Sequence, residues 1–142
     1  MADDLRPGSV ESRCDAIEEC YEFMLAYAAQ GLPGDQGSQS GGQVRFLLGR
    51  AAEALTGLAE VYAAVVLEEN LDPKDRFDGF LAVLKRDAGD ALAAVELVRA
   101  QPVISSQLID NLNASIHLRA LLTDVFLIDE VLKLRRVQAK SA

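Results

Sequence analysis

The sequence contains no tryptophan, a single histidine and two cysteines, and aromatic residues make up 6% of its 142 residues. With so few large aromatic side chains, the core must be filled by leucine, valine, isoleucine and alanine, a set that favours helices over sheets. The cysteines, Cys14 and Cys20, are six residues apart, so on a helix they point in different directions and cannot bond to each other. A chain of this length matches one domain without stabilising disulfides. We expect a reducing, cytoplasmic environment.

The sequence also lacks long apolar runs and an excess of positive charge. No stretch reaches the roughly 18 apolar residues of a membrane-spanning helix, and the acidic N-terminus does not have the apolar segment of a signal peptide. The net charge is −8 and the isoelectric point is near 4.6, which repels phosphate backbones and anionic lipid surfaces. We therefore expect neither a nucleic acid nor a membrane as a partner.

Four segments carry apolar residues at alternating steps of three and four, which is typical of amphipathic helices, and no segment alternates with a period of two. Glycine, proline and serine mark their ends, so we predict helices over residues 10–30, 43–70, 73–100 and 107–138. Gly79 and Gly89 leave open whether the third segment is one helix or two, and we favour one. This pattern predicts an all-α protein, an antiparallel four-helix bundle with long helices in a single domain over residues 1–142.

Residues 31–42 separate the first two predicted helices and contain five glycines and a proline. With Leu32 as their one large apolar residue, they cannot offset the entropy of ordering, so we predict a flexible connector. Ser40 and Gln43 have the spacing of a capping box for the next helix. We also expect frayed ends over residues 1–8 and 139–142.

The last predicted helix is apolar on two sides, whereas a surface helix in a bundle needs one apolar stripe. An uncovered stripe would leave a patch larger than soluble monomers usually expose, and a two-fold pair is the commonest way to bury it. We therefore predict a homodimer. Its candidate face is Leu118, Leu122, Val125 and Leu132.

The same segment carries one polar stripe, formed by Asp110, Asn113, His117 and Asp124. A carboxylate-bridged dimetal site in a bundle needs a glutamate three residues before each histidine, but Ala114 holds that position before His117. We predict no metal and no cofactor. Neither cysteine lies in a basic setting that would activate a thiol.

A helical bundle with an exposed histidine resembles a histidine-phosphotransfer domain in shape. That family's motif places lysine three and glycine four positions after the histidine, where this chain has Ala120 and Leu121. The resemblance implies a phosphate-accepting role for His117, and the two departures remove the charge and the access that the role requires. Phosphotransfer is therefore a minor alternative.

Two main functional interpretations follow from the sequence. The first is a non-enzymatic interaction module, an adaptor, regulator or chaperone-like bundle that binds itself and a partner protein, because the last helix has surplus apolar surface. The alternative is a small-molecule-binding or enzymatic bundle, with a central cavity made possible by small residues on the second helix. Polar groups that converge at the centre would distinguish the second interpretation from the first.

Overall fold

A computed structural model describes residues 7–141, and this part of the chain folds into six α-helices without a β-strand. The predicted all-α class is confirmed, with six helices where the sequence predicted four. The helices are α1 (Pro7–Ala29), α2 (Gln39–Leu55), α3 (Leu58–Glu68), α4 (Lys74–Arg99), α5 (Ser106–Ala114) and α6 (His117–Ser141).

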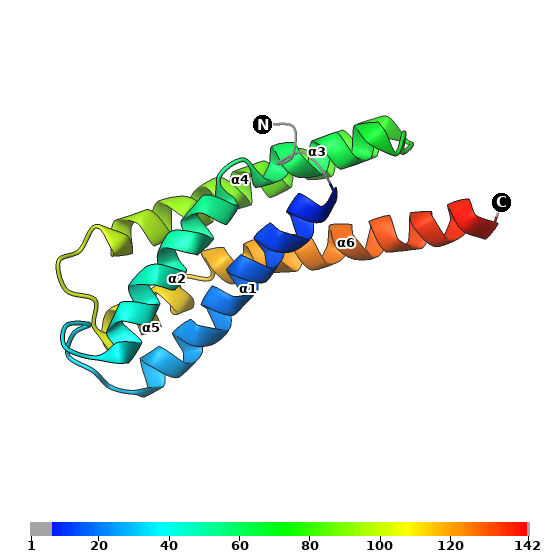
Figure 1. Ribbon diagram of the computed structural model, residues 1–142. Coiled ribbons are helices and arrows are strands. Elements are labelled where there is room, and N and C mark those ends of the chain that lie inside the picture. Colours follow the sequence, from blue (N-terminus) through cyan, green and yellow to red (C-terminus); the bar gives the residue numbers. More distant parts are fainter. Residues whose placement is uncertain (1–6, 142) are drawn as a thin grey trace.

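Figure 1 shows α1 beside α2, with α3 continuing beyond α2 after a bend, α4 running back along the molecule and α6 running in the opposite direction to α4. The helix α4 packs against α2, α3 and α6, while α5 packs mainly against α1. The core lies between these helices, and each of them contributes to it. Its fully buried side chains include Ile17, Leu48, Tyr62, Leu84, Ile109 and Leu121.

Gly57 divides the second predicted helix into α2 and α3. It has a φ of 75°, a left-handed conformation that glycine adopts without steric cost, and it stands at the N-cap of α3. Arg13 of α1 donates hydrogen bonds to the last carbonyls of α2, at 3.1 Å to Ala54 and 2.6 Å to Thr56. These hydrogen bonds hold the end of α2 against α1. The apolar spacing within the second segment does not predict them.

Ile116 divides the last predicted helix into α5 and α6. Its φ is 65°, which is rare and strained for a β-branched residue, and its side chain is 52% exposed. The turn changes the direction of the chain, so the two apolar stripes no longer lie on one helix. Ile109 and Leu112 face the core from α5, and a second stripe faces it from α6.

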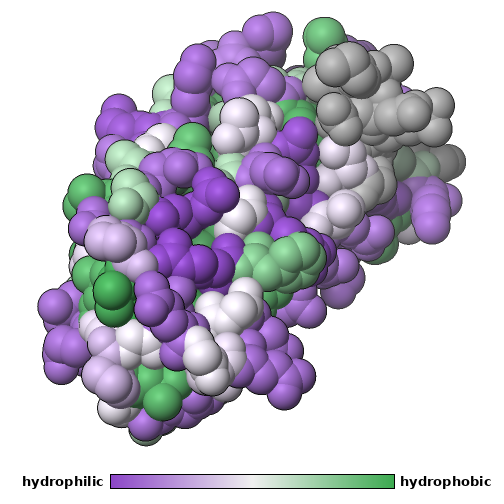
Figure 2. All heavy atoms as spheres, turned by 60° about the vertical axis from the view of Figure 1, so that its left-hand side comes forward, coloured by the Kyte–Doolittle hydropathy of each residue, from purple (hydrophilic) through white to green (hydrophobic). Residues whose placement is uncertain are grey.

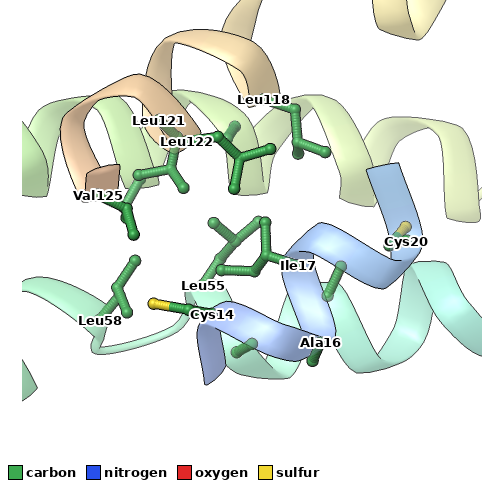
Figure 3. Close-up of a cluster of buried hydrophobic side chains, with 14 of the residues drawn as sticks. Cys14, Ala16, Ile17, Cys20, Leu55, Leu58, Leu118, Leu121, Leu122 and Val125 are labelled. Carbon is green, nitrogen blue, oxygen red and sulfur yellow. The ribbon is translucent and has the colours of Figure 1, made fainter. Parts of the chain in front are cut away.

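The predicted dimer face is wrong, because the monomer buries it. Leu118, Leu122, Val125 and Leu132 are between 1% and 5% exposed. Figure 3 shows the first three directed toward side chains of α1 and of the α2–α3 junction. The argument for a homodimer through these residues is therefore removed.

The segment predicted as a connector over residues 31–42 is shorter and better anchored than expected. The N-cap is Ser38, whose hydroxyl accepts from the Gly41 backbone, so α2 already includes residues 39–42. Asp35 is buried, and its carboxylate accepts from the Ile104 backbone at 2.7 Å and from the Arg45 side chain. The hydrogen bonds of this one buried carboxylate hold the loop in place, although the loop has few apolar side chains that could pack.

The third predicted helix is a single helix, α4, with both internal glycines in it. At the termini, residues 7, 8 and 139–141 are helical instead of frayed, and the remaining end residues lie outside the described part. Figure 2 shows one face of the molecule, on which hydrophilic residues predominate and hydrophobic ones form small separate patches.

Candidate interaction surface

The predicted polar stripe is not one surface. Asp110 and Asn113 belong to α5, whereas His117 and Asp124 belong to α6, on the other side of the turn at Ile116. His117 is the exposed first residue of α6 and not a mid-helix residue. The sequence argument assumed one continuous helix, and the turn makes that assumption wrong.

A buried polar network that the sequence did not reveal joins α1, α3 and α6. The Tyr62 hydroxyl donates to Asp129 Oδ1 at 2.7 Å and lies 3.3 Å from the Cys14 sulfur. Burial raises the pKa of Tyr62, and it raises the pKa of the Cys14 thiol to about 11. Both groups are therefore neutral at physiological pH, and Cys14 is unsuited to nucleophilic catalysis. The network serves to hold three helices together.

The second cysteine is also a core residue. Cys20 is fully buried, and burial raises its pKa to about 12. Over the described residues, no group of three or more histidine, cysteine, aspartate or glutamate side chains is placed to hold a metal ion. None of the described helices has both the length and the apolar character of a membrane span.

An apolar groove of about 220 Å³ lies between the first half of α4 and the middle of α6. Phe80 and Val131 are partly buried in its walls, and Leu127 is 55% exposed. Leu134, about two helical turns beyond Leu127 on the same face of α6, is 54% exposed. Two half-exposed leucines on one helix face, beside an apolar groove, are more apolar surface than the scattered single residues of ordinary protein surfaces.

Charged residues lie at one end of this groove and beyond its other end. At the first end, Arg76 lines the groove, and the Arg135 guanidinium lies 5.6 Å from the centre of the Phe77 ring and 3.6 Å from a carboxylate oxygen of Asp72. Asp87 follows Phe80 by seven residues on α4, and Asp124 precedes Val131 by seven on α6, so each lies on the same face as its groove residue. We call the whole surface the α4–α6 seam; it consists of Arg76, Phe77, Phe80, Asp87, Asp124, Leu127, Val131, Leu134 and Arg135.

At the acidic end of the seam, Asp87 is the charged residue that acts on the carboxyl group of Asp124, and the two residues belong to helices that pack against each other. Asp124 Oδ2 is buried, and no hydrogen-bond donor within residues 7–141 reaches it. Burial, followed by the hydrogen bond with Asp87, raises the pKa of Asp124 to about 7. The pair therefore holds one proton below neutral pH.

Known proteins do not place the chain in a family. Family models, curated proteins and solved structures give no match. The function of the protein must therefore be argued from the seam and from the buried groups around it.

The sequence contained part of the signal for the seam. The apolar residues Leu127 and Leu134 stood on one of the two stripes of the last predicted helix, although that stripe was assigned to the core. Asp124 was noted as part of a polar stripe, whereas Asp87 was missed because its neighbour is on another helix. The packing of α4 against α6 is part of the tertiary structure, and the residue spacing within either helix does not predict it.

Proposed function

We propose that the protein is a non-enzymatic interaction module that pairs with a second copy of itself through the α4–α6 seam. The observation that carries this proposal is the order of groups along the seam. A basic end is followed by an apolar middle and an acidic end. Such a surface is complementary to itself, which selects a second copy as its occupant.

The geometry of self-complementarity follows from two-fold symmetry. When two identical surfaces meet around a two-fold axis that crosses the seam at its centre and at a right angle, each end of one lies against the opposite end of the other. The arginines at the basic end then face the acidic pair of the partner twice, while the apolar middles meet. Complementary charge of this kind fixes the register and orientation of an interface more than it adds affinity.

The apolar middle supplies the driving force. Leu127 and Leu134 are each about half exposed, and burial of a whole leucine side chain contributes about 1.5–3 kcal/mol. A net charge of −8 on each copy repels two copies in most orientations. Opposite charges at the two ends of the seam permit contact in this one. The homodimer predicted from the sequence is thus proposed again, through a different face of α6.

Sedimentation equilibrium of the wild-type protein and two leucine variants tests this proposal. We expect wild type at high micromolar concentration to have twice the chain mass of 15.3 kDa. Leu127→Glu places a charge in the apolar middle and should raise the dimer Kd by about tenfold or more, equivalent to about 1.4 kcal/mol. Leu97→Glu is the matched control, because Leu97 is a 67% exposed leucine near the other end of α4.

A charge reversal tests the register. In Arg76→Glu the former basic end faces the partner's acidic end with like charge, so the dimer should weaken and its dependence on salt should change. A monomeric wild type would overturn the proposal, as would equal effects of Leu127→Glu and Leu97→Glu. If wild type is monomeric and instead binds a synthetic amphipathic helix at the groove, the surface serves another protein, and self-pairing is wrong.

The small-molecule alternative has less support in the structure. It needs polar groups that converge at the centre of the bundle and are free to bind a ligand. Tyr27 and Tyr62 are both fully buried, and the Tyr27 hydroxyl donates to the Ile104 carbonyl at 2.8 Å, so the hydroxyl left to consider is that of Tyr62. Its hydroxyl already has Asp129 and Cys14 as partners. Phosphotransfer by His117 would need a conserved helical setting around an exposed mid-helix histidine, whereas His117 begins α6.

A further inference from the structure

The acidic end of the seam contains the one side chain of α6 with a buried polar atom that no donor reaches. Asp124 Oδ2 has no hydrogen-bond donor in the described part of the chain, and the carboxyl group of Asp87 has no proton to give when it is ionised. Two carboxylates in contact repel each other, and a buried acceptor without a donor costs about 1–3 kcal/mol. A single shared proton removes both costs.

We propose that Asp87 and Asp124 form a proton-sharing carboxyl pair that links α4 to α6 and makes this helix contact sensitive to pH. With one proton, the pair contains a donor and an acceptor, and it acts as a hydrogen-bonded link between the helices. When that proton is lost, two like charges face each other across the contact. The proposal concerns the fold of a single chain and does not rest on self-association.

The surroundings of the pair favour the shared proton. Leu121 and Val125 flank Asp124 on α6, Leu84 and Ala88 lie on either side of Asp87 on α4, and all four are buried. Among the described residues, Asp87 is the charged group that acts on Asp124, and α1 and α5, which also pack against α6, add none. No basic side chain therefore compensates a second negative charge at this point.

The direction of the pH effect follows from proton linkage. Burial and Asp87 raise the folded-state pKa of Asp124 above its unfolded value, so between these two values the folded chain binds more protons than the unfolded chain. Stability from this pair is then present at low pH and is lost as the pH rises toward about 7. An ordinary salt-bridged aspartate would show the opposite slope.

Urea unfolding across a pH series tests the proposal, at low micromolar concentration so that any dimer is dissociated. Between about pH 5 and pH 8, the unfolding midpoint of wild type should fall as pH rises. Asp124→Asn keeps the shape and supplies an amide donor to Asp87 at every pH, so its midpoint should not show this fall. Asp110→Asn, at an exposed position of α5, is the control and should follow wild type.

A second measurement covers the case in which the substitution disturbs folding. Carboxyl carbon chemical shifts of wild type, followed by NMR, should show Asp124 titrating near neutral pH. A midpoint for Asp124 at the ordinary aspartate value, near 3.9, would overturn the proposal. Equal pH profiles of wild type and a folded Asp124→Asn would overturn it too. The urea series is run at low concentration, and the NMR titration can be repeated in the Leu127→Glu background, which should not pair. A failure of the seam as a dimer interface therefore does not affect either result.

Discussion

At the scale of single residues, two arginines add to the local caps of helix ends, at which the Thr56 backbone donates to Ala52 and the Ala100 backbone donates to Glu96. Arg13 donates to carbonyls at the end of α2, and Arg45 donates to the carbonyls of Gln101 at 2.8 Å and Pro102 at 3.1 Å, just beyond α4. The last carbonyls of a helix lack partners within the helix, and a cation there also complements the helix dipole. Each arginine comes from a different helix, so it satisfies a terminus and joins two elements at once.

Arg45 also orders the loop before α2. Its hydrogen bond to Asp35 is the main reason that the pKa of this carboxyl is lowered, and the backbone of Ile104 adds a second donor. An aspartate with a lowered pKa stabilises the fold at neutral pH, and this contribution is lost as the pH falls through the folded-state pKa. The carboxylates of Asp35 and Asp124 therefore respond to pH in opposite directions.

Ile116 gives the first prediction at this scale. Its left-handed backbone costs a β-branched residue about 1–2 kcal/mol, while its half-exposed side chain adds little packing. Ile116→Gly should therefore raise the free energy of unfolding by about 1 kcal/mol, after allowing for the backbone entropy of glycine in the unfolded state. Urea unfolding measures the change. Ile116→Val keeps the β-branch and should show no gain, and destabilisation by glycine would mean that this φ is not left-handed in solution.

At the scale of elements, the sequence predicted where helices occur better than where they break. Apolar spacing and terminal glycine, serine and proline residues placed α1 and α4 closely, because these signals are local. Gly57 lies within the apolar spacing of the second predicted helix, and Ile116 carries no turn signal within the last one. The partners that hold these turns come from elsewhere, such as Arg13 for the first, so no window of sequence contains the reason for the break.

The glycines of α4 give a prediction for one element. Gly79 and Gly89 have helical backbones, and an added Cβ at either would meet no atom within 4 Å. Gly79→Ala and Gly89→Ala should each raise the free energy of unfolding by about 0.5–1 kcal/mol, because glycine loses more backbone entropy in a helix. The double variant should show the sum, since the two sites share no neighbours.

A third glycine is the matched control for that series. Gly41 is also helical, but an added Cβ would overlap the backbone of Asp35, which cannot move as a flexible side chain can. Gly41→Ala should therefore lower the free energy of unfolding in the same assay. A gain at Gly41 would show that the loop around Asp35 is less tightly placed against α2 than the structure has it.

At the scale of the whole molecule, the net negative charge of the chain and its apolar seam together restrict where two copies can meet. A net charge of −8 keeps copies apart, so contact depends on a surface where the charges match. The sequence predicted surplus apolar surface on the last helix but assigned the wrong face to it. Which stripe is buried depends on the turn at Ile116 and on the position of α4, and both are tertiary features.

The two proposals together predict that self-association strengthens as pH rises. If the arginines at the basic end face the partner's acidic pair, they stabilise its ionised form, so pairing releases protons and is favoured where the carboxyl pair of the monomer would otherwise hold one. The dimer Kd of wild type should fall several-fold from about pH 6 to pH 8, although the rising net negative charge acts in the other direction. Asp124→Asn retains the seam but cannot ionise, so its Kd should rise slightly or stay constant over the same range, as measured by sedimentation at fixed ionic strength. If the Kd of both proteins changes in parallel, the acidic end does not face the basic end of the partner, and the two-fold arrangement around the centre of the seam is wrong even if a dimer forms.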